Sequence, residues 1–139
     1  MATYAATINV DASPEDAFAY LADPANRGEW DPSVRSVTAN GDGTFAVVVG
    51  FYGRAIDAVQ EVAESTAPTH IIFTTSGKVK GRDVITIAPR DGGSSVTIDL
   101  DVQLRGLARV LDRGLQVAFA GIGDNIASEM TRRLNRQSK

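Results

Sequence analysis

The last third of the sequence predicts one long amphipathic helix, running from about Leu107 to Leu134. Apolar residues recur there at steps of three or four positions, which places their side chains on one face of an α-helix. A helix of this length spans roughly 40 Å at about 1.5 Å per residue, enough to cross a small domain. Its apolar face requires an apolar surface to pack against. The residues of that face are Leu107, Leu111, Leu115, Ala118, Ile122, Ile126, Met130 and Leu134.

The middle of the chain is predicted to supply this surface as a β-sheet. Six short segments rich in β-branched residues are separated by links of two to six residues that contain turn formers. Links of this length permit hairpins but not the long crossovers that parallel strands need, so we expect an antiparallel sheet. Thr3–Val10 is predicted as a further, first strand. The six segments are Val34–Ala39, Phe45–Gly50, Arg54–Ala63, His70–Thr75, Val79–Ala88 and Ser94–Arg105.

The last of these segments shows which side of the sheet is buried. Its apolar side chains alternate with polar ones, so one face is expected to lie on the core and the other in water. The inward set is predicted to be Val96, Ile98, Leu100, Val102 and Leu104.

Two short helices are predicted between the first strand and the second. Ser13 can cap the first helix, Pro14 suits its first position, and Asp16 adds an acidic residue three positions after the cap. A second helix start follows at Asp23-Pro24, with a short helix expected through Gly28.

This order of elements resembles the helix-grip fold of the START, polyketide-cyclase and birch-pollen-allergen superfamily, often called SRPBCC proteins. The residues that carry the resemblance are Ile8–Phe18, Leu21–Pro24 and Trp30–Pro32. The resemblance implies an α+β fold in one domain over residues 1–139, with a seven-stranded curved antiparallel sheet, two short N-terminal helices and one long C-terminal helix. The superfamily includes lipid carriers, cyclases, hormone receptors and chaperone-binding modules, so the fold alone does not select an activity.

Composition argues against several kinds of site. The chain has no cysteine and one histidine, which disfavours a thiol nucleophile, a zinc site or a Ser-His-Asp triad, so we expect no metal and no cofactor. The net charge of −3 argues against a nucleic-acid partner. No apolar run approaches the roughly 20 residues of a membrane span, and the N-terminus lacks the pattern of a signal peptide. We therefore expect a cytoplasmic protein, either a monomer or a homodimer.

A curved sheet wrapped around one helix tends to leave a hollow between them, and this hollow is the predicted site. We interpret the chain as binding a small hydrophobic or aromatic molecule, such as a lipid or a polyketide, because such a site needs mainly shape and apolar walls. Trp30 has an alternative role as a core anchor of the short helix. The predicted ligand-binding residues are Trp30, Phe51, Tyr52, Phe73, Ile85, Phe119 and Ile122.

Asp83 is a polar residue that can reach this hollow. It shares the face of Ile85 if the strand keeps its period of two, and an inward carboxylate would have a raised pKa or a partner such as Arg54 or Arg82. A β-bulge at Gly81 would instead turn Asp83 outward.

An enzyme of the polyketide cyclase or dehydrase type is the first alternative function. It would need a polar group aimed into the hollow to move a proton, and the weak catalytic candidates are Asp83, His70 and Tyr52. His70 also suits an exposed position at the start of its strand, as a solvated or hydrogen-bonded residue.

A protein-interaction module, like the ribosome-associated or quinone-chaperone relatives, is the second alternative. The turn Gly50-Phe51-Tyr52-Gly53 carries two aromatic residues where turns are usually polar. The pair can form a gate over the pocket, a dimer contact, or a cluster folded back onto the core.

Two glycines lie inside the predicted long helix, at a cost of about 1 kcal/mol each relative to alanine. Gly121 and Gly123 either let the sheet approach the helix closely or widen the cavity beside Phe119 and Ile122.

Overall fold

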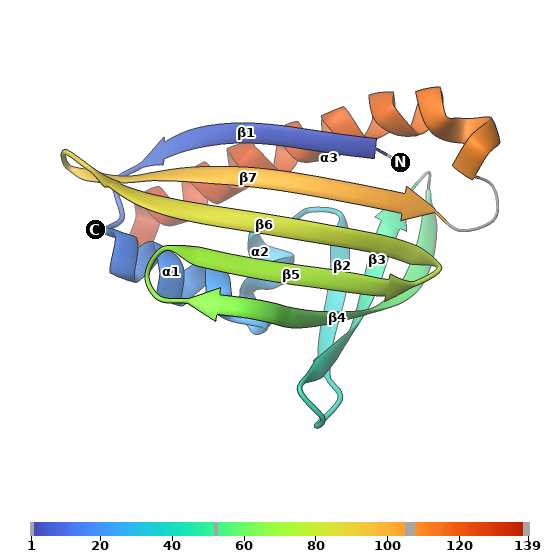
Figure 1. Cartoon of the computed structure of the whole chain (residues 1–139), viewed down its shortest axis with the longest axis horizontal. Helices are drawn as coiled ribbons and strands as arrows, with labels where there is room; N and C mark the ends of the chain where they lie inside the picture. Colours follow the sequence, from blue (N-terminus) through green and yellow to red (C-terminus); the bar gives the residue numbers. More distant parts are fainter. Residues whose placement is uncertain (1, 52, 105–107, 138–139) are drawn as a thin grey trace.

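The computed structural model of the protein describes residues 2–51, 53–104 and 108–137 (Figure 1). It confirms the α+β helix-grip architecture, with the predicted elements in the predicted order. The helices are α1 (Pro14–Ala22), the 3-10 turn η1 (Pro24–Asn26), α2 (Arg27–Trp30) and α3 (Ala108–Gln137). The strands are β1 (Ala2–Val10), β2 (Val34–Ala39), β3 (Thr44–Phe51), β4 (Arg54–Thr66), β5 (His70–Gly77), β6 (Val79–Arg90) and β7 (Gly93–Leu104).

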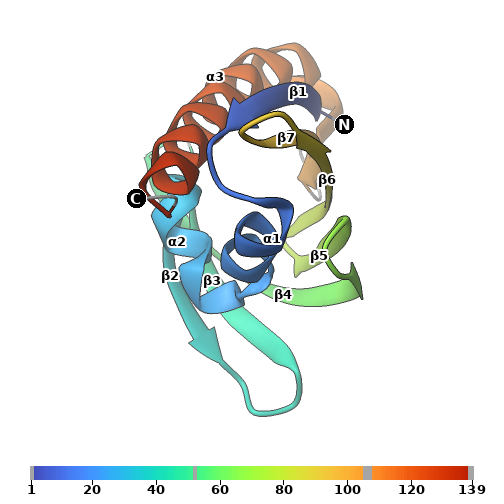
Figure 2. The same cartoon turned by 90° about the vertical axis from the view of Figure 1, so that its left-hand side faces the viewer.

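The seven strands form one antiparallel sheet in the order β1-β7-β6-β5-β4-β3-β2. Strands β2 to β7 follow one another as hairpins, while β1 pairs with β7 at the far end of the sheet. Figure 2 shows the sheet curling around the helices, which lie on its concave side. The long helix α3 packs mainly along β1. None of the described helices is long and apolar enough to cross a membrane.

The predicted helix caps form, but the second short helix extends further than expected. The Asp16 amide donates to Ser13 Oγ at 3.2 Å, and the Ala25 amide donates to Asp23 Oδ1 at 3.0 Å. After η1 the chain continues as α2 through Trp30 rather than ending at Gly28. The side chains of Arg27 and Trp30, at the two ends of α2, are both buried.

The core lies between the concave face of the sheet and the three helices. The predicted alternation of β7 is confirmed, since Val96, Ile98 and Leu100 are buried while Asp99 and Asp101 are exposed. The apolar face of α3 contributes Ile126, Met130 and Leu134, which are also buried. The side chains of residues 104–115 lie outside the described ones, and they include the predicted face residues Leu104, Leu107, Leu111 and Leu115.

Candidate functional site

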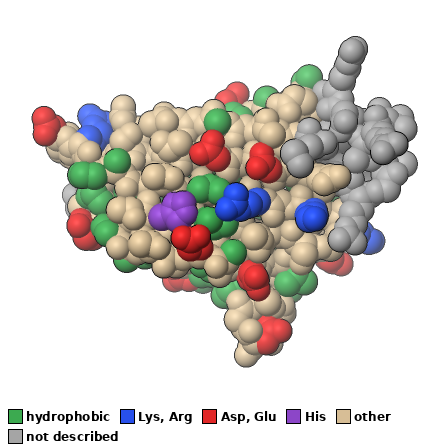
Figure 3. All heavy atoms as spheres, viewed as in Figure 1, with side chains coloured by type: hydrophobic (Ala, Val, Ile, Leu, Met, Phe, Trp, Pro, Cys, Tyr) green, Lys and Arg blue, Asp and Glu red, His purple; other side chains and the backbone are tan. Residues whose placement is uncertain are grey.

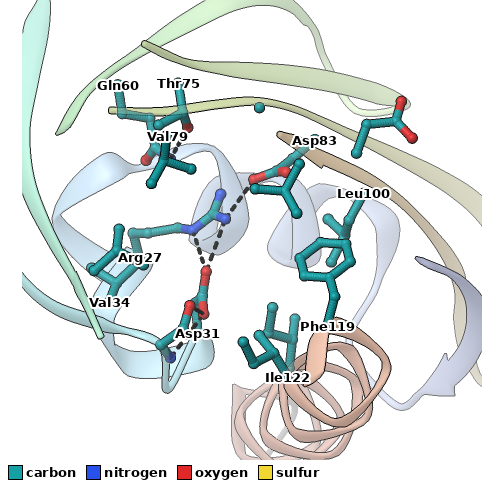
Figure 4. Close-up of a pocket in the computed structure, with 16 residues that line it drawn as sticks. Arg27, Asp31, Val34, Gln60, Thr75, Val79, Asp83, Leu100, Phe119 and Ile122 are labelled. Carbon is teal, nitrogen blue, oxygen red and sulfur yellow. Dashed lines mark hydrogen bonds and ion pairs between the residues drawn. The ribbon is translucent and has the colours of Figure 1, made fainter. Parts of the chain in front are cut away.

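A pocket lies between the concave face of the sheet and α3 (Figure 4). Its cavity volume is about 80 Å³. Apolar side chains from the sheet and from α3 form most of its wall. Among them are Val79, Leu100, Phe119, Ile122 and Ile126.

A buried cluster of three charged side chains forms the polar part of this wall. Arg27 Nη2 donates to Asp83 Oδ2 at 2.5 Å and lies 2.9 Å from Asp31 Oδ2, while Arg27 Nε donates to the same Asp31 oxygen at 3.0 Å. Arg27 and Asp31 are four residues apart around α2, whereas Asp83 comes from β6. The cluster therefore links the short helix to the middle of the sheet.

Aromatic rings support the arginine from the core side. The guanidinium carbon of Arg27 lies 4.4 Å from the centre of the Trp30 ring and 5.2 Å from that of Phe73. The two rings pack against each other with their centres 6.4 Å apart. A guanidinium is weakly hydrated for a cation and stacks well on aromatic faces, which makes arginine suited to a buried ion cluster. Rings and carboxylates together hold Arg27 in one orientation.

Asp83 is the carboxyl of the cluster whose pKa is raised, although it pairs with Arg27. Burial raises the pKa of Asp83 above its ordinary value, and the Arg27 guanidinium opposes this effect only in part. Burial also opposes the charge of Arg27, but Asp83 and Asp31 outweigh it and raise the pKa of Arg27. Arg27 therefore stays charged, while Asp83 can hold or release a proton next to the pocket.

A second polar pair lies on the strands above this cluster. Gln60 of β4 is buried, and its Nε2 donates to Thr75 Oγ1 of β5 at 3.3 Å. Figure 4 shows Gln60 and Thr75 on the strand side of the pocket, with Arg27 below them and Phe119 and Ile122 opposite. Within the described part of the chain, no three histidine or acidic side chains come together in a way that would hold a metal ion.

Three of the residues predicted from the sequence line this pocket: Asp83, Phe119 and Ile122. Trp30, Phe73 and Ile85 are buried in the core instead, with at most 1% of each exposed. The bulge considered at Gly81 does not turn Asp83 outward, because β5 and β6 pair without a shift from Gly81 to Ile85.

His70 lies on the outer face of the sheet. It pairs with Thr86 on β6, one register position away from the inward pair of Ile71 and Ile85. Its Nε2 lies 4.0 Å from Glu64 Oε1, and Figure 3 shows this histidine on the surface beside an acidic side chain. The sheet therefore separates His70 from the cluster around Asp83.

The predictions for the aromatic turn lie outside the described residues. These are Tyr52 as a whole and the side chain of Phe51, so their roles as ligand contacts, gate or partner surface stay predictions. The alternative of a protein-interaction module, in which this turn or the arginine-bearing long helix meets a partner, also stays a prediction.

Sequence reasoning missed the polar pocket residues Arg27, Asp31, Gln60 and Thr75. The partner of Asp83 is Arg27, whereas the candidates considered from the sequence were Arg54 and Arg82. Arg82 is exposed on the outer face, and the side chain of Arg54 lies outside the described ones. The available signal was the spacing of four between Arg27 and Asp31, which allows an ion pair along a helix.

Comparisons with known proteins agree with this architecture. A family model described as polyketide cyclase / dehydrase and lipid transport matches residues 1–135. No curated protein sequence matches the chain. A protein from Thermus thermophilus has a TM-score of 0.81 at 16% identity, with 99% of each chain covered.

Two further solved structures carry descriptive names. A START superfamily protein from Mycobacterium smegmatis has a TM-score of 0.79 at 16% identity, over 96% of this chain and 97% of that one. The di-domain ARO/CYC StfQ from the steffimycin biosynthetic pathway has a TM-score of 0.73 at 10% identity, over 98% of this chain and 52% of its own. At these identities the likeness shows a shared fold.

Proposed function

The chain belongs to the polyketide cyclase / dehydrase and lipid transport family, and from this premise we propose that it binds a small hydrophobic or aromatic molecule in the pocket between sheet and α3. The observation that carries the proposal is the pocket's composition. Its wall is mainly apolar, and its few polar side chains are held in place by hydrogen bonds and ion pairs. Small-molecule sites typically combine an apolar wall with a few fixed polar groups in this way.

The volume of the pocket limits the size of the ligand. Pockets that bury drug-sized molecules measure roughly 300–1,000 Å³. The cavity here is about 80 Å³, so it accommodates little more than a single ring. A ligand of ten or more atoms must extend out of this cavity. We therefore expect one end of the ligand to be buried and the other to remain near solvent.

Native mass spectrometry of the purified protein, followed by denaturing extraction, tests this proposal. We expect a small apolar molecule to co-purify with the wild-type protein. Ile122→Trp fills the pocket from α3 and should abolish the bound mass, whereas Val117→Trp on the same helix should retain it because Val117 is 76% exposed. A bound mass that survives Ile122→Trp would place the ligand elsewhere and contradict the proposal.

A polyketide cyclase or dehydrase activity is the second candidate, and the position of Asp83 favours it. Its carboxyl lines the pocket, and burial raises its pKa, a combination common among groups that exchange protons in catalysis. In an aldol closure, Asp83 would take a proton from the carbon beside a carbonyl and give it to the alkoxide oxygen that forms when this carbon bonds to the second carbonyl. In the loss of water that follows, Asp83 would take a second proton from the same carbon and give it to the hydroxyl, which leaves as water as the C=C bond forms.

The test of this activity uses an isosteric substitution. Asp83→Asn retains an oxygen that can accept a hydrogen bond from Arg27. The amide, unlike the carboxyl, cannot take up and return a proton. With a short poly-β-ketone as substrate, we expect product formation by the wild-type protein and a loss of about 10²-fold or more in the variant. Equal rates for both proteins would exclude Asp83 as the acid or base. Ligand binding, measured on the same preparations, is expected to persist in both.

A further inference from the structure

Two polar atoms of the pocket residues have no hydrogen-bond partner among the described residues. They are Arg27 Nη1, a donor, and Gln60 Oε1, an acceptor. Both side chains are deeply buried, with 4% of Arg27 and 3% of Gln60 exposed. A buried polar group left unpaired costs about 1–3 kcal/mol, so a ligand that satisfies both atoms gains affinity that a plain hydrocarbon does not.

Neighbouring contacts fix the direction of both atoms. The other two nitrogens of the Arg27 guanidinium are bound to Asp31 and Asp83, so the planar group cannot turn without breaking these bonds. The amide nitrogen of Gln60 donates to Thr75 Oγ1, and in this orientation the amide oxygen is the acceptor without a partner. In Figure 4 the guanidinium nitrogen without a dashed line points away from Asp31, towards the strands that carry Thr75, Val79 and Gln60.

The charge of the cluster decides which polar group fits. A buried arginine in a pocket usually indicates a carboxylate or phosphate ligand, because the guanidinium pairs with both. Here two carboxylates already pair with the single cation. An anionic ligand would bring a further negative charge beside Asp31 and Asp83, and it would offer no donor to Gln60. At short range in a buried site, such like-charge contacts are costly.

We infer that the ligand is uncharged and that its buried end carries both a hydrogen-bond acceptor for Arg27 Nη1 and a donor for Gln60 Oε1. A primary amide and a hydroxyl group both meet this requirement, whereas a carboxylate does not. The inference rests on the proposed binding function, and it adds that the arginine selects for neutral polar groups rather than for acids.

Four single-ring probes of equal heavy-atom number test the inference: benzamide, benzoate, acetophenone and isopropylbenzene. Benzamide offers a donor and an acceptor, acetophenone an acceptor alone, benzoate acceptors with a negative charge, and isopropylbenzene neither. In NMR titrations of the wild-type protein at neutral pH, we expect the Kd of benzamide to be at least about tenfold lower than the Kd of benzoate. Acetophenone should bind more weakly than benzamide but more tightly than isopropylbenzene.

Substitutions separate the two interactions. Gln60→Met keeps the side-chain length but removes the acceptor, so it should remove the preference for benzamide over acetophenone. Gln103→Met makes the same change at an exposed position of β7 and should leave the preference intact. Asp83→Asn removes one negative charge, so it should improve the binding of benzoate relative to benzamide.

The outcomes distinguish the inference from the function on which it rests. Benzoate binding as tightly as benzamide, or equal binding of benzamide and acetophenone, would overturn the inference and leave the binding function in place. A preference for benzamide that survives Gln60→Met would also overturn it. Failure of all four probes, isopropylbenzene included, would instead contradict the proposed pocket function itself.

Discussion

The two carboxylates around Arg27 differ in how well their charge is compensated. Asp31 accepts from Arg27 and, through its other oxygen, from the Ser33 amide at 3.1 Å and Ser33 Oγ at 2.6 Å. Asp83 accepts one hydrogen bond, from Arg27, among the bonds of the described residues. Since each donor favours the ionised form of a carboxyl, Asp83 is the member of the cluster at which a proton is best held.

At the residue scale, we predict that Asp83 lowers the free energy of unfolding as pH rises, whereas the carboxylate of an exposed salt bridge raises it. Its pKa in the folded state lies above the ordinary value of 3.8, so the native state binds this proton more tightly than the unfolded state. Its contribution to stability is therefore fully present below the unfolded pKa and is lost as pH rises through the folded pKa. The pKa itself can be read from a ¹³C NMR titration of the Asp83 carboxyl.

Urea unfolding of the wild-type protein and Asp83→Asn, across about pH 3 to 7, measures the effect on stability. Because asparagine does not titrate, the wild-type protein should lose stability relative to the variant as pH increases. A constant difference in unfolding free energy between the two proteins over this range would contradict the raised pKa.

At the element scale, the two glycines of α3 have different neighbours. A Cβ added to Gly123 would lie 2.3 Å from Cγ of Tyr4, so the absence of a side chain lets the Tyr4 ring of β1 lie against the helix. The same ring reaches Asp124, whose Oδ1 accepts from the Tyr4 hydroxyl at 2.9 Å. Gly121 faces open space, with no atom within 4 Å of an added Cβ. Close packing thus accounts for Gly123, and neither of the two explanations considered from the sequence accounts for Gly121.

We predict that alanine has opposite effects at these two positions. Gly121→Ala should stabilise the protein by up to about 1 kcal/mol, because it improves helix propensity without meeting any neighbour. Gly123→Ala gains the same propensity but overpacks the contact with Tyr4, and overpacking typically costs about 1–3 kcal/mol, so we expect net destabilisation. Thermal unfolding of both variants provides the measurement. Stabilisation by Gly123→Ala would show that α3 can shift away from β1 without loss.

Local patterns predicted the elements well, because periodicity and caps act over a few residues. The alternation of β7 and the Ser13-Pro14 helix start are examples of signals contained in the segment itself. Contacts between distant segments were harder to obtain from the sequence. The pairing of Asp83 with Arg27 spans 56 residues, and it depends on how the curved sheet brings β6 next to α2. The sequence therefore predicted Asp83, Phe119 and Ile122 of the pocket wall, but it did not predict Arg27 as the partner of Asp83.

At the scale of the whole molecule, α3 is attached to the rest of the structure on both sides of the pocket. Towards its N-terminal end, Gln116 exchanges two hydrogen bonds with the backbone of Thr3, at 2.9 Å and 3.1 Å. Towards its C-terminal end, Arg133 Nη1 lies 3.7 Å from Glu29 Oε1, which also accepts from the Tyr20 hydroxyl at 2.8 Å. The first attachment joins α3 to β1, and the second joins it to α1 and α2.

These two attachments predict that the ends of α3 open independently. Gln116→Leu removes the bonds to Thr3, so amide hydrogen exchange should increase in the first half of β1 and in α3 near Gln116. Arg133→Met should increase exchange in α1, α2 and the end of α3 instead. Local openings of this kind need not involve global unfolding, and hydrogen exchange followed by mass spectrometry resolves them by segment. Uniform acceleration of exchange along the whole helix in both variants would show that α3 detaches as one unit and would contradict independent opening of its ends.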